Sequence, residues 1–221
     1  MLLSLCLALC ASLNYLERTS IVLSDKRIIE EMQNGNIVIE PFDERQLGTN
    51  SYDCRLGEWY FAQDIEGQEL RLFSEDIRTS WGGPRKAKNG EIPVRPGETI
   101  LAHTMEIVGG QNGFLAKMHT RSTVARSGLS VCRCAGLGDV FYINIWVMEI
   151  SNHTHNTIWI PVGGRICQMC FYETGETLKS YSGSYGQKEA WSPNDMLPSA
   201  KSDWSVAEYR NREENNGSTA K

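Results

Sequence analysis

The chain has 221 residues, of which 41% are hydrophobic and 22% charged, and a net charge of -5. This ordinary globular composition excludes a disordered or fibrous chain. A mean hydropathy of -0.36 and the lack of an apolar run of ~18 residues argue against a membrane span, and the acidic balance argues against a nucleic-acid coat protein. The odd count of seven cysteines is typical of reduced thiols, so we expect a cytoplasmic protein with neither a membrane nor a nucleic-acid partner.

The chain begins with an apolar stretch, MLLSLCLALCASL, which is long enough for a signal-peptide core. Because the usual basic residues before such a core are missing, we interpret residues 1–20 as an extension outside the folded domain. An organellar or leader role for it stays open. Residues 21–198 are predicted to form the domain, and residues 199–221, rich in polar side chains, to form a flexible tail.

A short helix is predicted first in the domain, and strands follow it. Ser24 suits a helix N-cap, Ile28 and Met32 share a face, and Gly35 is a C-terminal stop. Strand-like pieces come next, with turn signals such as Gly109-Gly110 between them. They lie at residues 36–39, 52–56, 58–61, 69–73, 99–107, 141–150, 157–160 and 165–172. Many short strands with little helix predict a mainly β sandwich or barrel.

Positive charge is concentrated in the stretch between Glu106 and Asp139, which contains no Asp or Glu. Its cations are Lys117, Arg121, Arg126 and Arg133. A cationic segment rich in Ser and Thr indicates a small anionic ligand such as a phosphate. A solvated or interface face is the alternative.

Within that stretch, Arg121-Ser-Thr-Val-Ala-Arg-Ser-Gly128 predicts one or two helical turns that end at Gly128. Ser122 and Arg126 are then four residues apart and share a face. Free N–H groups at the helix start, two hydroxyls and a guanidinium would together cradle a phosphate. A capped connector helix uses the same residues without a ligand.

Residues 141–150, FYINIWVMEI, alternate as a strand does, so that Phe141, Ile145 and Glu149 point to one side. A carboxylate that closes an apolar face is costly to bury unless it has a partner or a function. Burial would raise the pKa of Glu149 towards the range of a general base. The alternative is a strand end where Glu149 reaches water beside an arginine.

Two pairs of neighbouring cysteines, Cys132 with Cys134 and Cys167 with Cys170, raise the question of a metal. Residues 167 and 170 of one strand would point to opposite faces, which is poor ligand geometry. Zinc nucleotide deaminases carry H-x-E and P-C-x-x-C motifs, but Ile166 precedes Cys167 here. We therefore expect no zinc and interpret these cysteines as buried core thiols.

Together these segments resemble the dCTP deaminase family, within the dCTP deaminase/dUTPase superfamily, over about residues 21–198. Their order fits the family pattern, as does the spacing from Arg126 to Glu149. The segments that carry the resemblance are Leu23-Ser-Asp-Lys-Arg-Ile28, Ile39-Glu-Pro-Phe-Asp43, Ser51-Tyr-Asp-Cys-Arg-Leu-Gly57, Arg121-Ser-Thr-Val-Ala-Arg-Ser-Gly-Leu129, Met148-Glu-Ile-Ser-Asn152, Gly164-Arg-Ile-Cys-Gln168, and Tyr181 with Tyr185-Gly-Gln187.

The resemblance implies a distorted β-barrel, jelly-roll-like subunit of the dUTPase type with short helices, in a homotrimer with active sites at subunit interfaces. It implies hydrolytic deamination of dCTP to dUTP and ammonia in pyrimidine deoxynucleotide metabolism, with Mg²⁺ carried by the triphosphate and no zinc. It makes Glu149 the general base, helped by Ser122 and Arg126. The residues it implies for binding the dCTP or dUTP nucleotide are Arg121, Ser122, Thr123, Val124, Ala125, Arg126, Asp139, Val147, Met148, Glu149, Gln168, Tyr181 and Gln187.

The sequence also departs from the family pattern. Ser184 stands where a lysine is usual, Cys134 where a threonine is common, and Gly136-Leu-Gly-Asp-Val-Phe141 loses the proline and glycine of a G-x-x-D-P-G stretch. The alternatives on this fold are a dUTP diphosphatase, a bifunctional deaminase and diphosphatase giving dUMP, and a nucleotide-binding regulator without turnover. A dUTP diphosphatase needs no carboxylate at Glu149, and retention of the whole catalytic set argues against the regulator.

Overall fold

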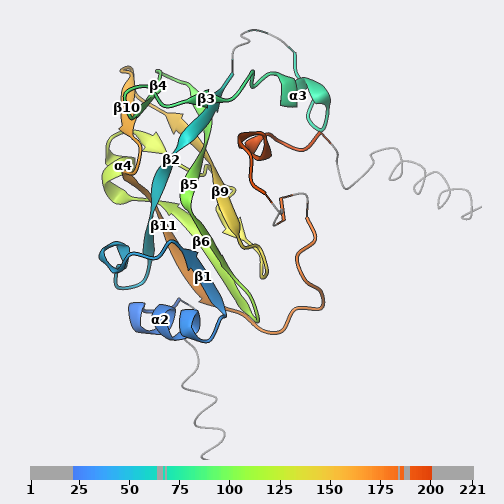
Figure 1. Ribbon diagram of the computed structural model, residues 1–221. Coiled ribbons are helices and arrows are strands. Elements are labelled where there is room, and N and C mark those ends of the chain that lie inside the picture. Colours follow the sequence, from blue (N-terminus) through green and yellow to red (C-terminus); the bar gives the residue numbers. More distant parts are fainter. Residues whose placement is uncertain (1–21, 64–66, 68, 184, 187–189, 201–221) are drawn as a thin grey trace, which may run out of the picture.

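The computed structural model describes residues 22–63, 67, 69–183, 185–186 and 190–200. They form a curled nine-stranded sheet and a separate two-stranded sheet, with short helices at the periphery (Figure 1). The strands are β1 Ile37–Glu40, β2 Tyr52–Ala62, β3 Arg85–Lys86, β4 Glu91–Val94, β5 Thr99–Gly110, β6 Phe114–Thr120, β7 Leu129–Ser130, β8 Leu137–Gly138, β9 Asn144–Asn152, β10 Ile158–Pro161 and β11 Arg165–Glu173. The helices are α2 Asp25–Gln33, η1 Glu44–Gln46, α3 Glu75–Thr79, α4 Ser122–Arg126 and η2 Pro193–Met196.

The large sheet has the order β7-β9-β5-β2-β11-β6-β8, with β1 paired to β5 and β3 to β2, and β10 pairs with β4 in the small sheet. The predicted mainly β, barrel-like class is therefore confirmed, while the homotrimer stays a prediction for this single chain. The predicted extension, residues 1–20, and nearly all of the predicted tail, 199–221, lie outside the residues that the structure describes. None of the helices in the described part is both long and apolar enough to cross a bilayer.

The predicted first helix is confirmed as α2. The Ser24 hydroxyl accepts the N–H of Arg27 at 3.4 Å and caps the helix start. Ile28 is fully buried, and Gly35 adopts a φ of 74° just after the helix, where a side chain would be strained. The sequence therefore predicted the N-cap residue of α2, one of its buried side chains and the glycine that follows it.

Several of the predicted strands need correction. Residues 52–56 and 58–61 form the single strand β2, with a register shift beside Gly57, where the His103 ring occupies the space of a Cβ atom. Residues 69–73 form no strand: Leu72 is 72% exposed, Phe73 has a φ of 62°, and no neighbouring strand covers them. They lead instead into α3.

The Gly109-Gly110 pair is not a turn but the end of β5. A Cβ atom at either position would collide with the Tyr142 carbonyl or the Phe114 backbone, so the glycines permit close backbone approach. Phe141 has a φ of 74°, and β9 consequently starts at Asn144 rather than at residue 141. Phe141 therefore does not share the strand face on which the sequence placed it.

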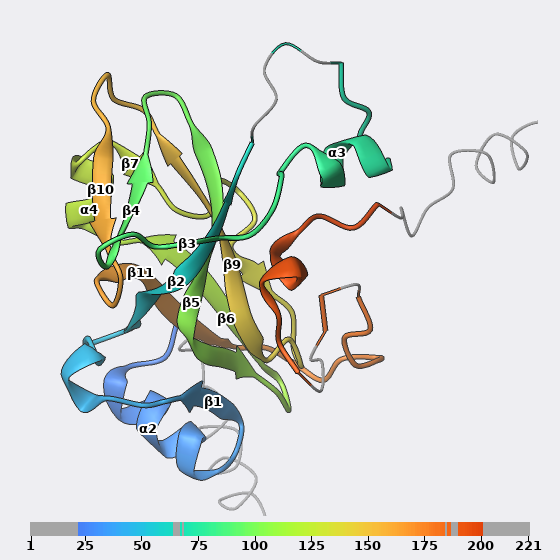
Figure 2. The ribbon, with the colours of Figure 1, turned by 45° about the horizontal axis from the view of Figure 1, so that its top comes forward.

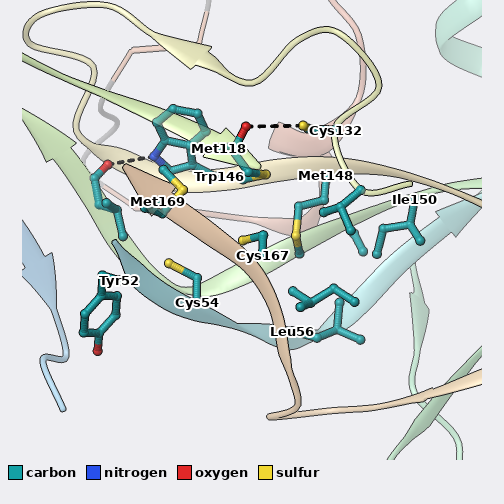
Figure 3. Packing of buried hydrophobic residues seen from close by; sticks show 14 of the residues in the cluster. Tyr52, Cys54, Leu56, Met118, Cys132, Trp146, Met148, Ile150, Cys167 and Met169 are labelled. Atoms are coloured by element: carbon teal, nitrogen blue, oxygen red, sulfur yellow. Dashed lines mark hydrogen bonds between the residues drawn. The ribbon is translucent and has the colours of Figure 1, made fainter. Parts of the chain in front are cut away.

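Strand β9 separates the main core from a second face of the sheet. Trp146, Met148 and Ile150 point into the main core, where they lie with Cys54 and Cys167 (Figure 3). The Trp146 indole donates a hydrogen bond to the Val108 carbonyl at 2.8 Å, and the Cys132 thiol donates one to Met118 at 3.6 Å (Figure 3). The intervening residues of β9 consequently face the opposite side.

The second face is covered by a smaller apolar cluster. The buried members of this cluster are Phe61, Trp81, Leu101 and Met196. Met196 belongs to η2, which lies beside β9 and brings the C-terminal segment onto the sheet (Figure 2). This packing places the candidate site between the sheet and the end of the described chain.

Candidate active site

Glu149 lies in the interior of β9, opposite Leu101 of β5. Its Oε2 atom is buried and has no hydrogen-bond partner among the described residues. Loss of hydration raises the pKa of Glu149, while the positive charge of Arg133 acts in the opposite direction. The alternative of a strand end is wrong, because β9 continues to Asn152, but Glu149 is only half-buried. A carboxylate with a free, desolvated oxygen can take a proton from a water molecule.

A cavity of about 500 Å³, which we call the Tyr142 cavity, opens in front of Glu149. Its lining residues are Gln63, Ile77, Trp81, Leu101, Ala135, Leu137, Gly138, Asp139, Tyr142, Trp146, Val147, Glu149, Tyr181, Tyr185, Met196 and Pro198. The volume and the mainly apolar walls with a few polar groups are typical of a small-molecule site.

Aromatic rings form one wall of the Tyr142 cavity. The Tyr142 ring meets Trp146 edge-on at 5.1 Å and Tyr181 edge-on at 5.4 Å between centroids. Burial raises the pKa of Tyr142 to about 12, so its hydroxyl is neutral at physiological pH. A wall of this kind can hold a flat heteroaromatic ring by stacking or edge contacts.

The C-terminal segment closes over this region from outside. The Asn144 side-chain amide donates a hydrogen bond to the Tyr185 carbonyl at 3.0 Å. Further along, Trp191 packs on the His103 ring with 4.5 Å between ring centroids. Tyr181 therefore reaches the site as the sequence predicted, whereas Gln187 and Ser184 lie outside the described residues.

A second cavity, of about 510 Å³, lies on another side of Glu149, and we call it the Arg133 cavity. Its lining residues are Gln63, Trp81, Arg95, Pro96, Gly97, Glu98, Thr99, Arg133 and Glu149. It is more polar than the Tyr142 cavity, and Glu149 lines both. Sequence reasoning singled out Arg133 only as one cation among four.

Two other predicted residues, Arg121 and Gln168, lie at a different place beside Asp53 and Arg165, and we call these four residues the Arg121 cluster. The Asp53 carboxylate accepts from Arg121 at 3.0 Å and Arg165 at 3.4 Å, and Gln168 lies opposite it across β11 and β2. Burial raises the pKa of Asp53, and the two guanidinium groups oppose that effect. Residues 107–138 contain no Asp or Glu, but in the folded chain the carboxylate of Asp53 lies against Arg121 of this stretch.

Asp53 is a member of the Arg121 cluster that sequence reasoning did not single out. It appeared only as part of the Ser51–Gly57 motif, and its role depends on the pairing of β2 with β11. The predicted helix is confirmed as α4, followed by Gly128 at a φ of 85°. Its Ser122 and Arg126 side chains are exposed.

The predicted site residues therefore fall into two groups within one chain. Asp139, Val147, Glu149 and Tyr181 line the Tyr142 cavity, whereas the side chain of Met148 lies in the core. Neither Gln168 nor any residue of 121–126 lines the Tyr142 cavity or the Arg133 cavity. The predicted acidic and aromatic residues thus lie at the Tyr142 cavity, whereas the predicted cationic residues lie elsewhere in the chain.

The cysteines only partly match the sequence interpretation. Cys132 and Cys167 are buried, as core thiols would be, but Cys134 is exposed and Cys170 is half-buried. In the part of the chain that the structure describes, no three His, Cys, Asp or Glu side chains are grouped for metal binding. The expectation of a zinc-free site stays a prediction.

The fold is a mainly β domain of the dCTP deaminase type. The chain belongs to the dCTP deaminase-like family, whose family model matches residues 22–174. Its fold is similar to the crystal structure of 2'-deoxycytidine 5'-triphosphate deaminase from Agrobacterium tumefaciens, with a TM-score of 0.55 and 19% identity. That match covers 71% of this chain and 49% of the Agrobacterium chain.

Curated relatives give closer sequence matches. A "dCTP deaminase, dUMP-forming" of Leptospira biflexa is 31% identical over 180 residues, which is 78% of this chain and 94% of the relative. A protein of the same name from Methanospirillum hungatei is 28% identical over 168 residues, which is 76% of this chain and 89% of the relative. The family resemblance inferred from the sequence is confirmed.

Proposed function

We propose that this protein catalyses the hydrolytic deamination of dCTP, with Glu149 as the general base. The observation that carries the proposal is the buried Oε2 atom of Glu149, which has no partner among the described residues, at an aromatic cavity of nucleotide size. Membership of the dCTP deaminase-like family supports the substrate class. A regulator that only binds nucleotide would not need to keep a desolvated carboxylate that lowers its stability.

In the proposed reaction, Glu149 takes a proton from water as the water oxygen forms a bond to C4 of the cytosine. The electrons of the C4–N3 double bond move to N3, which takes up the proton that Glu149 removed from water. The carboxylate then moves the proton of the new C4 hydroxyl to the amino group, the C4–N4 bond breaks as the C4 carbonyl forms, and ammonia leaves. Water and dCTP are consumed, and dUTP and ammonia are formed, so atoms and charge balance. The raised pKa of Glu149 suits a group that must both accept and return a proton.

The complete site, we propose, is assembled from two copies of the chain in a homotrimer. The exposed side chains of Ser122, Thr123 and Arg126 do not line the Tyr142 cavity of their own chain. Docked against a second copy, Arg126 and Ser122 would stabilise charge that develops on the cytosine. Arg121 and Thr123, together with Gln168, would hold the phosphates.

The triphosphate is proposed to bring Mg²⁺ with it. Magnesium is commonly held by substrate phosphates and waters with few protein ligands, and among the described residues no three His, Cys, Asp or Glu side chains are grouped to hold a metal. When bound, the ion would neutralise phosphate charge. The protein residues that face this charge are Arg121 and its neighbours on α4.

A second candidate is a bifunctional enzyme that releases dUMP. The names of the Leptospira and Methanospirillum relatives favour it. Within this chain, Asp139 places another carboxylate on the wall of the Tyr142 cavity, where it could act on a second water during phosphate cleavage. A dUTP diphosphatase without deaminase activity would leave Glu149 unexplained.

Chromatography of the products tests these functions. Purified protein is incubated with Mg²⁺ and either dCTP or dUTP, beside the Glu149→Gln variant. We expect dCTP to give a uracil nucleotide and ammonia with the wild-type protein only. Release of dUMP and diphosphate identifies the bifunctional enzyme, and dUTP as the sole product identifies a simple deaminase. Unchanged dCTP, or an active Glu149→Gln variant, contradicts the proposal.

A further inference from the structure

The side chain of Arg133 is fixed over the outer face of the sheet. Its Nε atom donates a hydrogen bond to the Ser151 hydroxyl at 3.0 Å, and Nη2 donates to the Thr99 hydroxyl at 2.5 Å. The two hydroxyls are themselves 2.8 Å apart. A guanidinium held by two hydroxyls on adjacent strands has a defined position even though part of it is exposed.

This position places the guanidinium on the wall of a cavity that Glu149 also lines. Ser151 pairs with Thr99 and Glu149 pairs with Leu101, so Ser151 and Glu149 are two residues apart on the same face of β9. Two residues along a strand span about 7 Å. Arg133 and Glu149 accordingly line the same cavity.

The backbone is also arranged to bring Arg133 there. Arg133 has a φ of 43°, in the left-handed region that side chains other than glycine rarely adopt. The turn is closed by a hydrogen bond from the Ala135 N–H to the Cys132 carbonyl at 2.8 Å. An arginine kept in this conformation, rather than a glycine, indicates that its side chain has a role.

The other charged and titratable groups around Glu149 differ from Arg133. In the Tyr142 cavity and the adjoining core they are Asp139, Tyr142, Tyr181, Tyr185 and Cys132, and in the Arg133 cavity they are Arg95 and Glu98. Glu98 accepts the Arg95 N–H at 2.7 Å and lies 4.0 Å from its guanidinium. Among the described residues, Arg133 has no carboxylate within 4.0 Å, whereas Arg95 is paired with Glu98.

We propose that Arg133 is a positioning residue. Its guanidinium, in the Arg133 cavity beside the Tyr142 cavity, keeps the Glu149 carboxyl group ionised in the resting enzyme. The inference rests on the proposed function, in which Glu149 must be a carboxylate to take a proton from water. Desolvation alone favours the protonated acid, which is no base. A fixed cation on the wall of the same cavity favours the charged form without a direct ion pair that would block the reactive oxygen.

The test compares the pH dependence of kcat/KM for dCTP in three variants with that of the wild type. Arg133→Met removes the charge, Arg133→Lys keeps it, and Arg95→Met removes a charge from the same cavity that is already balanced by Glu98. We expect the acidic limb to move up by roughly one pH unit in Arg133→Met and to stay in place in the other two. Protonation of dCTP itself affects every pH profile equally, so it does not contribute to the differences between the variants and the wild type.

An acidic limb that is unchanged in Arg133→Met overturns the inference, as does an equal shift in Arg95→Met. Infrared difference spectroscopy provides a readout that does not depend on turnover. The carboxyl band lost in Glu149→Gln identifies Glu149, and its titration midpoint should rise by the same amount in Arg133→Met. If the wild type does not deaminate dCTP, the proposed function fails, while this titration still decides the role of Arg133. Matching melting temperatures at pH 8 show that the variants fold.

Discussion

Replacing Glu149 with glutamine should stabilise the protein at pH 7.5 while it abolishes deamination. In the folded chain, one carboxylate oxygen is buried without a partner among the described residues. Burial raises the pKa of this group above its ordinary value of 4.5. Glutamine keeps the shape of the side chain and carries no charge that has to be desolvated.

The magnitude follows from the extra cost of burying a charged carboxylate rather than a neutral amide of the same shape, because glutamine also leaves a polar group without a hydrogen bond. That difference is about 1–3 kcal/mol, and partial exposure together with the charge of Arg133 reduces it here. We expect Glu149→Gln to raise the free energy of unfolding by about 1–2 kcal/mol at pH 7.5. For a chain of this size, such a gain corresponds to a rise of about 2–8 °C in Tm.

The pH dependence has a defined sign. The folded state binds the Glu149 proton more tightly than the unfolded state, so the stability that this group contributes is present below pH 4.5. It is lost as the pH rises through the higher pKa of the folded state. The advantage of Glu149→Gln should therefore be small near pH 4 and grow to its full size at neutral pH.

Urea denaturation at several pH values measures this effect, with Glu91→Gln as the matched control. Glu91 lies on β4 with its side chain exposed, so its substitution should change stability little at any pH. Equal stability of Glu149→Gln and the wild type at pH 7.5 would refute the reasoning. A gain of the same size at pH 4 would refute it as well, because it could not arise from desolvation of a charge.

Two further predictions concern assembly and packing. If the site joins Glu149 of one copy to Arg126 of another, inactive Glu149→Gln and Arg126→Gln proteins, refolded together in equal amounts, should recover about a quarter of the wild-type activity by random assortment. No recovery would place both residues in one subunit. Met148 is fully buried in the main core. In urea denaturation, Met148→Ala should lower the free energy of unfolding by about 2–5 kcal/mol, and Met148→Leu should lower it by less than about 1.5 kcal/mol.

Local patterns in the sequence predicted the parts of the fold that depend on local interactions. The cap and stop of α2, the short helix α4 and the alternation that leads to Glu149 each lie within one segment. Residues 69–73 show the limit of this reasoning, because an apolar pattern becomes a strand only where another strand pairs with it. The Gly109-Gly110 pair was misinterpreted for a related reason: its glycines serve a backbone approach from Tyr142 and Phe114.

The sequence pointed to Asp139, Glu149 and Tyr181, which line one cavity, but it did not show how the candidate residues divide between two places. The carboxyl group of Asp53 neutralises part of the positive segment only because β2 and β11 are paired and because Arg121 reaches across that pair. The separation of α4 from the Tyr142 cavity likewise depends on the curl of the sheet. The position of Arg133 beside Glu149 depends on the pairing of Thr99 with Ser151.

The central claim, that Glu149 activates water for attack on the cytosine of dCTP, has a direct test. Ammonia release from dCTP is measured for the wild type and for Glu149→Gln, with dCTP binding followed in parallel by calorimetry. We expect the variant to bind dCTP with an affinity within about tenfold of the wild type and to release no ammonia. Ammonia release at the wild-type rate by Glu149→Gln, or none from the wild type, would contradict the account.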